Sequence, residues 1–191
     1  MHNLSDYELM LLVKGKQHAA LSTLYDRHAK LVYSFAWRSV KEEAAAKDIV
    51  QAVFLRLWTT ESVYNPDKGK FVNWLLTIVR NITADALRKR RRENKGMLHY
   101  LREDLERIPD GVSLSPEAQA EHQFVREQIR TAYRHLSKQQ ITLLEHFYWE
   151  GYTLSELAAL YNQPLGTVKN RLHQTLKILR RHLTAEGVGT G

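Results

Sequence analysis

The stretch that decides the fold is residues 151–183, GYTLSELAALYNQPLGTVKNRLHQTLKILRRHL. Its apolar side chains recur at intervals of three and four residues, which predicts two helices separated by a turn at residues 162–166. Pro164 and Gly166 act as helix breakers in this turn, and Asn162 tolerates a left-handed backbone. Thr167 then caps or opens the second helix. The pattern is typical of a helix-turn-helix.

The second of these helices has two unlike faces. Val168 and Leu172 open an apolar stripe that faces the core. Most of the basic and amide side chains fall off this stripe, and they are Lys169, Asn170, Arg171, Gln174, Lys177, Arg180 and Arg181. Such side chains read base edges in the major groove of DNA. The alternative is an ordinary helical hairpin with a solvated basic face, because charged faces are usually only hydrated.

The composition fits a helical protein with a polyanionic partner. The chain has 191 residues, of which 43% are hydrophobic, and its formal net charge is +7. That charge favours nucleic acid, but proteins that bind ribosomes or membrane surfaces share it. Because there is no cysteine, disulfides and cysteine-ligated metals are excluded, and a cytoplasmic location is expected. No apolar run approaches the length of a membrane span, so no membrane insertion is expected.

Patterns typical of catalysis or metal binding are missing from the sequence. The histidines are scattered, without a His-x-x-x-His or Glu-x-x-His pair. Neither a phosphate-binding loop nor a nucleophile motif occurs. We therefore expect no catalytic residue, no bound metal and no cofactor.

The N-terminal half is predicted to contain four helices. The first begins at a capping box formed by Ser5 and Glu8. The second spans residues 18–37 and carries an apolar stripe that we expect in the core, formed by Leu21, Leu24, Tyr25, His28, Leu31, Val32 and Phe35. Within this stripe, His28 is interpreted as a packed histidine rather than a ligand.

The third helix, residues 44–58, is predicted to have a docking face. Its inner stripe is Ile49, Ala52, Val53 and Leu57. Another face mixes polar groups with large apolar ones, namely Asp48, Gln51, Leu55 and Trp58. Such a mixture is unusual for a solvated surface and suggests a protein partner. The spacing equally allows Leu55 and Trp58 to make a second core contact.

The fourth helix, residues 71–92, follows a loop at residues 61–70 that is rich in turn-forming residues. It ends in five consecutive cations, Arg88-Lys89-Arg90-Arg91-Arg92. Such a run repels itself and needs either solvent or an anionic partner. Aromatic rings at Phe71 and Trp74 followed by cations suit single-stranded nucleic acid, which stacks on rings and pairs its phosphates with cations. The alternative is a solvated helix end that the helix dipole stabilises.

Residues 93–121 differ in composition from both flanking regions. They contain seven acidic residues against three basic ones, together with Pro109-Asp110-Gly111. We interpret this segment as a flexible acidic linker between a first domain, residues 1–92, and a second domain, residues 122–185. Residues 186–191 are expected to be a frayed tail. The predicted fold is therefore all-α, with two small helical domains.

The second domain is predicted to be a unit of four helices that ends in the helix-turn-helix. Its first helix reaches residue 136, with Ile129 and Ala132 among the expected core positions. Ser137 and Gln140 form a capping box for the next helix, and Gly151 ends it.

With both halves placed, the chain resembles the extracytoplasmic-function (ECF) group of the sigma-70 family of bacterial sigma factors. In the first half the resemblance rests on residues 48–58, DIVQAVFLRLW, and on the pattern from Phe71 to Arg90. In the second half it rests on residues 136–152 and on residues 166–172, GTVKNRL. It departs from the family where Asn162 replaces a common glycine and Gln163 replaces a usual apolar residue.

The resemblance implies a function and a set of site residues. Sigma factors of this group are not enzymes; they bind core RNA polymerase and direct it to promoters. The residues implied to dock on the coiled coil of the largest polymerase subunit are Asp48, Gln51, Phe54 and Leu55. Those implied to engage the −10 element are Asn65, Lys68, Lys70, Trp74, Asn81, Asp85, Arg88, Lys89, Arg90 and Arg91. Those implied to read the −35 element are Thr167, Lys169, Asn170, Arg171, Gln174 and Lys177.

The resemblance also implies further partners. The second domain of such proteins docks on the polymerase flap, and family members are commonly held inactive by an anti-sigma factor. Two rivals stay open at this point. One is a helix-turn-helix regulator that acts without docking on polymerase, and the other is a helical enzyme of nucleic acid, which would need convergent catalytic groups.

Overall fold

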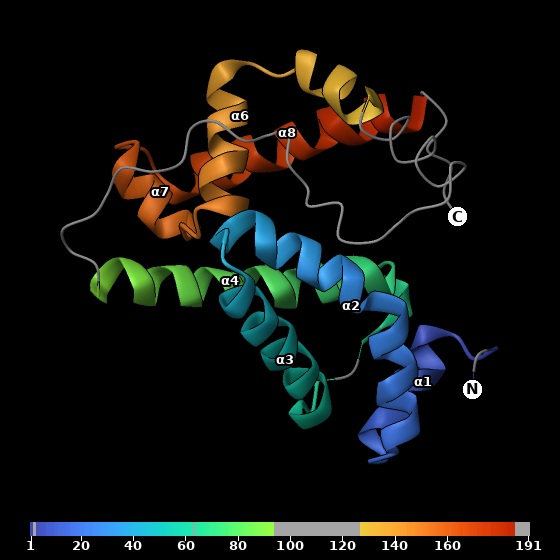
Figure 1. Ribbon diagram of the computed structural model, residues 1–191. Coiled ribbons are helices and arrows are strands. Elements are labelled where there is room, and N and C mark those ends of the chain that lie inside the picture. The colour runs from blue at the N-terminus through green and yellow to red at the C-terminus, as the bar shows by residue number, and fades with distance from the viewer. Residues whose placement is uncertain (2, 63, 94–126, 186–191) are drawn as a thin grey trace. The chain divides into compact units, whose positions relative to one another are not determined.

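The computed structural model describes residues 1, 3–62, 64–93 and 127–185, and every regular element in those ranges is helical (Figure 1). The chain divides into two compact units, residues 1–101 and 102–191. The prediction of an all-α fold made of two helical units is therefore confirmed. Most of the predicted acidic linker, from residue 94 onward, and the predicted tail lie outside the described residues.

The N-terminal unit is built around one long helix, α2. Within its described residues the α-helices are α1 (Asp6–Lys14), α2 (His18–Val40), α3 (Glu43–Thr59) and α4 (Phe71–Glu93). α2 packs against the other three, and a short 3-10 helix, η1 (Pro66–Lys68), lies in the loop before α4. The predicted capping box is confirmed: the Ser5 hydroxyl accepts a hydrogen bond from the Glu8 backbone, and the Glu8 carboxylate accepts one from the Ser5 N–H at 2.7 Å.

The core of this unit contains three of the four residues of the inner stripe predicted for α3, and the fourth, Ala52, is half-buried. Ile49, Val53 and Leu57 are at most 3% exposed. His28 is buried as well; its Nε2 lies 3.0 Å from the Asp6 carboxylate, and its ring centroid lies 5.1 Å from that of Phe71. The interpretation of His28 as a packed histidine is thus confirmed.

Two residues of α2 that were expected in the core are on the surface. Tyr25 is 47% exposed and Leu31 is 38% exposed. Helical spacing identifies an apolar stripe but not its width. In α2 the apolar side chains spread over more of the helix surface than α1, α3 and α4 cover, so the expectation for these two residues was wrong.

The C-terminal unit consists of helical residues 127–134, α6 (Lys138–Leu144), the π-helix η2 (Glu145–Trp149), α7 (Leu154–Leu160) and α8 (Leu165–Ala185). α8 packs against α6 and α7. The cluster of buried apolar residues is small and consists of Leu136, Leu143, Leu144, Leu157, Val168 and Leu172. Ala132 is buried as expected, whereas Ile129 is 43% exposed, so its placement in the core was wrong.

The helices of this unit begin and end where the sequence predicts, with one exception. The Ser137–Gln140 capping box is present, and Gly151 ends the helical segment with a φ of 73°. Asn162 adopts the expected left-handed backbone with a φ of 49°. However, α8 begins at Leu165 rather than at Thr167. Gly166 therefore lies inside the helix, and its interpretation as a breaker was wrong.

We expect Leu57→Ala to lower the free energy of unfolding by about 2–5 kcal/mol, because Leu57 is 1% exposed and its truncation leaves a cavity. Leu55 lies on the same helix but is 58% exposed, so Leu55→Ala is the matched control and should change stability by less than about 0.5 kcal/mol. Urea unfolding followed by tryptophan fluorescence measures both variants. Equal losses for the two would contradict the assignment of the core.

Candidate docking groove and DNA-binding surfaces

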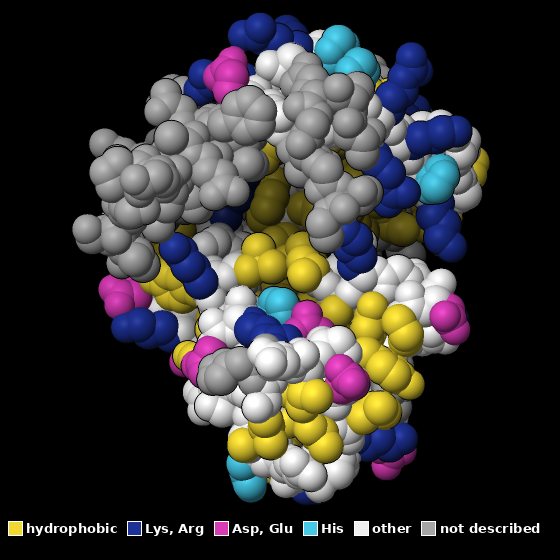
Figure 2. All heavy atoms as spheres, turned by 90° about the vertical axis from the view of Figure 1, so that its right-hand side faces the viewer, with side chains coloured by type: hydrophobic (Ala, Val, Ile, Leu, Met, Phe, Trp, Pro, Cys, Tyr) yellow, Lys and Arg dark blue, Asp and Glu magenta, His cyan; other side chains and the backbone are white. Residues whose placement is uncertain are grey.

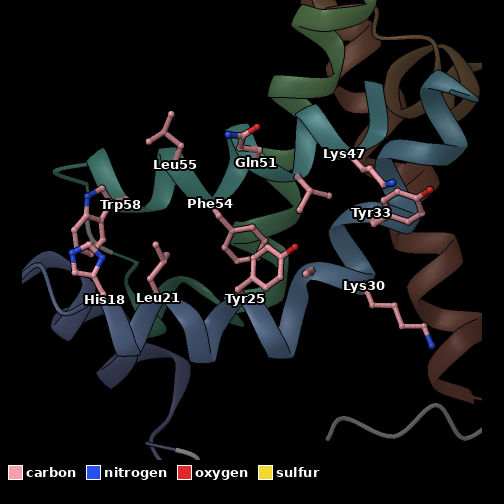
Figure 3. A pocket seen from close by; sticks show the side chains of 12 residues that line it. His18, Leu21, Tyr25, Lys30, Tyr33, Lys47, Gln51, Phe54, Leu55 and Trp58 are labelled. Carbon is pink, nitrogen blue, oxygen red and sulfur yellow. The ribbon is translucent and has the colours of Figure 1, made fainter. Parts of the chain in front are cut away.

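An apolar groove of about 740 Å³ runs between α2 and α3 on the N-terminal unit. Figure 3 shows side chains of α2 along one wall and side chains of α3 along the other. The lining residues are His18, Leu21, Tyr25, Ala29, Lys30, Tyr33, Lys47, Val50, Gln51, Phe54, Leu55 and Trp58. A groove with apolar walls on a helical unit has the shape that accepts an amphipathic helix.

Ring contacts set the form of this groove. The Tyr25 and Phe54 rings lie 4.8 Å apart and hold the two helices together at its floor. At one end the His18 ring stacks on Trp58 at 4.5 Å. Lys16 secures the same end, because its ammonium donates to the Trp58 carbonyl at 2.7 Å and lies 4.9 Å from the centre of the ring.

The opposite end of the groove carries cations. Figure 3 places Lys30 and Lys47 there, away from His18 and Trp58. Lys47 donates a hydrogen bond to Glu43 at 2.6 Å, which raises the pKa of Lys47 and lowers the pKa of Glu43. Lysine groups at one end of an apolar groove favour a partner helix that carries acidic residues beside its apolar stripe at that end.

The predicted docking residues occupy this region unevenly. Gln51, Phe54 and Leu55 line the groove, whereas Asp48 is exposed on α3 but is not among the lining residues. Phe54 is only 6% exposed and forms part of the floor, while Leu55 projects outward. Sequence reasoning missed the wall formed by α2, because Leu21 and Tyr25 share the spacing of true core residues.

A second candidate surface lies on the loop before α4. The Asn65 side chain accepts a hydrogen bond from the Asp67 N–H at 2.8 Å, which caps η1. The Tyr64 hydroxyl donates to the Gly69 carbonyl at 2.6 Å and closes the loop. Gly69 has a φ of 131°, a conformation that favours glycine. Tyr64 was not identified from the sequence, because a single aromatic residue in a polar loop carries no periodic signal.

Trp74 belongs to an aromatic cluster rather than standing alone. Its ring centroid lies 5.8 Å from Tyr64 and 5.6 Å from Phe71, and its side chain is half-buried. The predicted polar residues Asn65, Lys68 and Lys70 of the loop and Asn81 of α4 are exposed. The cluster therefore fixes the loop and leaves a polar rim in contact with solvent.

The five consecutive cations at the end of α4 differ in the contacts that they make. Arg90 reaches back to the end of α2, where one guanidinium nitrogen lies 3.3 Å from the Val40 carbonyl and 3.3 Å from the Glu42 carboxylate. Arg88 is paired with Asp85 on the same helix. Lys89 is 73% exposed and lies 3.9 Å from Glu93, and Arg91 is half-buried. The run thus combines anchoring residues with cations that face solvent.

The third candidate surface is the outer face of α8. Buried Val168 and Leu172 fix this helix on the core, and the Thr175 hydroxyl donates to the Arg171 carbonyl at 2.8 Å. The predicted −35 residues Thr167, Lys169, Asn170, Gln174 and Lys177 are exposed, while Arg171 is half-buried. The sequence of α8 contains lysine and arginine but no acidic residue. In Figure 2, Lys and Arg side chains gather over the upper part of the view, where the C-terminal unit lies.

Two further contacts, which the sequence did not reveal, hold the helix-turn-helix. Thr153 and Glu156 form a capping box at the start of α7, with the Glu156 carboxylate 2.6 Å from the Thr153 N–H. In η2, His146 Nδ1 is hydrogen-bonded to the Tyr161 hydroxyl at 2.8 Å. Tyr161 is the C-cap of α7, directly before the turn, so this contact ties the turn to η2.

Burial raises the pKa of the Tyr161 phenol, and the Glu150 carboxylate raises it further, while Arg171 acts in the opposite direction. The folded state therefore holds the phenolic proton more tightly than the unfolded chain does. This contribution to stability is present below the unfolded pKa of about 10 and is lost as the pH rises beyond it.

Neither metal ligation nor membrane insertion is supported by the described part of the chain. Within those residues no three His, Cys, Asp or Glu side chains are grouped to hold a metal ion. In the same ranges no helix is both long and apolar enough to cross a membrane.

Taken together, the units define a helical protein with an apolar groove on one unit and a helix-turn-helix on the other. Two family models match: Sigma-70 region 2 over residues 24–93, and Sigma-70, region 4 over residues 132–181, which together cover more than half of the chain. The chain belongs to the sigma-70 family. Sigma factors regulate transcription and are not enzymes.

Relatives whose sequences match this chain along most of their own length are named ECF RNA polymerase sigma factors. The ECF RNA polymerase sigma factor SigL of Mycobacterium tuberculosis is 29% identical over 171 residues, which cover 89% of this chain and 92% of that protein. The ECF RNA polymerase sigma factor RpoE of Cereibacter sphaeroides is also 29% identical, over 88% of this chain and 89% of its own. The chain is also similar to a chain in the crystal structure of Rhodobacter sphaeroides SigE in complex with the anti-sigma ChrR. The sequence identity is 26% and the TM-score is 0.41, and the match covers 92% of this chain and 95% of that chain.

We expect Tyr161→Phe to lower the free energy of unfolding by about 0.5–1.5 kcal/mol near pH 7, because it removes one hydrogen bond and keeps the ring. The difference from the wild type should shrink above about pH 10, where the wild-type phenol loses its proton and phenylalanine does not titrate. Urea unfolding at pH 7, 9 and 10.5, followed by circular dichroism, measures it. A difference that does not change with pH would contradict the assigned pKa shift.

Proposed function

We propose that this chain is an ECF-type sigma factor that binds core RNA polymerase and directs it to promoters with −35 and −10 elements. The observation that supports this most is the presence of Sigma-70 regions 2 and 4, in that order, on one chain. The relatives named ECF RNA polymerase sigma factors match along most of their own length, which supports the same assignment for the whole chain. Such a protein works with polymerase in the cytoplasm.

The groove between α2 and α3 is the proposed docking site for the coiled coil of the largest polymerase subunit. A coiled coil presents apolar side chains flanked by charged ones. The apolar surface formed by Leu21, Phe54 and Leu55 would bury the apolar side chains of the coiled coil, and Lys30 and Lys47 at one end would attract its acidic residues. Asp48 and Gln51 would bind at the edge of the same contact, and the second domain would bind the flap.

The loop before α4, together with the exposed side of α4, is the proposed −10 surface. Strand separation requires capture of unstacked bases, and a base outside the stack needs a pocket that hydrogen-bonds its edge. Exposed Asn65 and Asn81 supply amide groups for such a pocket, and Lys68, Lys70 and Lys89 supply charge for phosphates. Arg90 is proposed to act indirectly, because its guanidinium holds the end of α2.

The outer face of α8 is the proposed −35 reader. An arginine pairs well with guanine and an asparagine with adenine, and each such pair contributes about 1–3 kcal/mol of discrimination. Arg171 and Asn170 have these side chains, and Thr167, Lys169, Gln174 and Lys177 extend the same basic face. We further propose that an anti-sigma factor inhibits the chain by covering the groove, since a protein seated there would exclude polymerase.

We expect the wild-type chain to make core polymerase start transcription at defined promoters in a run-off assay, while the chain alone does not select start sites. Leu55→Glu should weaken binding to core polymerase by about tenfold or more, since it places a charge in an apolar contact. Leu11 is also an exposed leucine of the N-terminal unit, at 44%, but lies on α1 outside the groove. Leu11→Glu is therefore the matched control.

Two results of this assay would contradict the proposal. Promoter binding that neither needs core polymerase nor changes its start sites would favour a helix-turn-helix regulator. Equal binding to core polymerase by the Leu55→Glu and Leu11→Glu variants would show that the groove is not part of the docking surface.

For the −10 surface, we expect Lys89→Ala to lower the slope of log binding constant against log salt concentration by about 0.7–0.9, the value for one phosphate contact. Lys89 is 73% exposed, so its loss should leave the fold intact. Lys14→Ala, at an exposed lysine of α1, is the control and should leave the slope unchanged. The slope is measured with the reconstituted complex on promoter DNA, and an unchanged slope for Lys89→Ala would exclude this phosphate contact.

A further inference from the structure

No steric or conformational feature of the fold requires glycine at position 166, in the first turn of α8. Gly166 is the second residue of this helix, and its φ is not in the left-handed region. A Cβ built at this position meets nothing within 4 Å. Because glycine is disfavoured in helices by its conformational entropy, alanine would suit this position better in the free protein.

The other glycines in the described part of the chain differ in this respect. Gly69 and Gly151 have φ values of 131° and 73°, which L-residues rarely adopt. At Gly15 a Cβ would come within 3.3 Å of the Leu12 carbonyl oxygen. Each of these positions has a conformational or steric reason for glycine, so Gly166 needs an explanation from outside the chain.

The surroundings of Gly166 point to an external surface that comes close. Leu165, the residue before it, is 45% exposed, and Leu160 at the end of α7 is 54% exposed. Thr167, Lys169 and Asn170 follow on the exposed face of the same helix. α8 contains basic residues and no acidic one, so the surface that fits it is a polyanion.

We propose that Gly166 is a contact residue for duplex DNA, and that its missing side chain lets the first turn of α8 lie closer to the −35 element than a Cβ would permit. This inference rests on the proposed function, since it takes α8 as the −35 reader. It assigns to Gly166 a role in affinity that lies outside the stability of the fold. Substitutions at Gly166 therefore have opposite effects on the free protein and on the DNA complex.

The test is a size series at this position, Gly166→Ala and Gly166→Leu, measured in the complex with core polymerase. Thermal unfolding of the free chain should stay the same or rise by about 1–4 °C, since both residues favour helix more than glycine does. Affinity for a promoter duplex should fall about threefold or more for alanine and about tenfold or more for leucine, because both add atoms to a close-packed contact. On a duplex whose −35 sequence is replaced, the variants and the wild type should bind alike.

The matched control is Gln139, which is also the second residue of a helix in the same unit, α6, and is also exposed. Gln139→Ala and Gln139→Leu should leave promoter affinity unchanged. Wild-type affinity in Gly166→Leu overturns the inference, and so does a loss of affinity accompanied by a lower unfolding temperature. If the wild-type chain itself fails to direct core polymerase to promoters, the proposed function fails first, and that result is distinct from both.

Discussion

The structure depends on the limited amount of helix surface that each small unit can bury. In the C-terminal unit, Leu143, Leu157 and Val168 belong to a cluster that is too small to cover more than one face of α8. In the N-terminal unit, α2 is in contact with three helices and still exposes Tyr25 and Leu31. Burial of apolar area is the main stabilising term in folding. What the core leaves uncovered is therefore available to partners, and the groove and the outer face of α8 both arise in this way.

The parts of the fold that were predictable have signals within a few residues of one another. Ser5 and Ser137 are each followed three residues later by a side chain that completes a capping box, and both boxes formed. Asn162 was expected to take a left-handed backbone and has a φ of 49°. The helical periods that located α3, α4 and α8 depend on the same local rule. For these features the tertiary structure adds nothing that contradicts the local preference.

What could not be predicted depends on contacts between distant residues. Tyr25 has the spacing of a core residue, and only the position of α3 shows that it lines a groove. The link from His146 to Tyr161 joins a residue within a π-helix to one fifteen positions later, and a π-helix has no sequence pattern of its own. Glycine is a typical helix breaker, yet α8 begins before Gly166, because buried Val168 and Leu172 anchor the helix. In each case packing overrides a local propensity.

The run of cations at the end of α4 shows why charge alone does not define a binding surface. A sequence of five basic residues predicts an anionic partner for all of them, but the guanidinium of Arg90 is held by the Val40 carbonyl and by Glu42. A cation that caps a helix C-terminus stabilises the fold through the helix dipole. Lys89 has no comparable tie to another helix among the contacts described, since Glu93 lies on α4 itself. Neighbouring residues of one run thus divide between holding the helices in place and facing solvent, so the charge that the run leaves for an anionic partner is smaller than the sequence indicates.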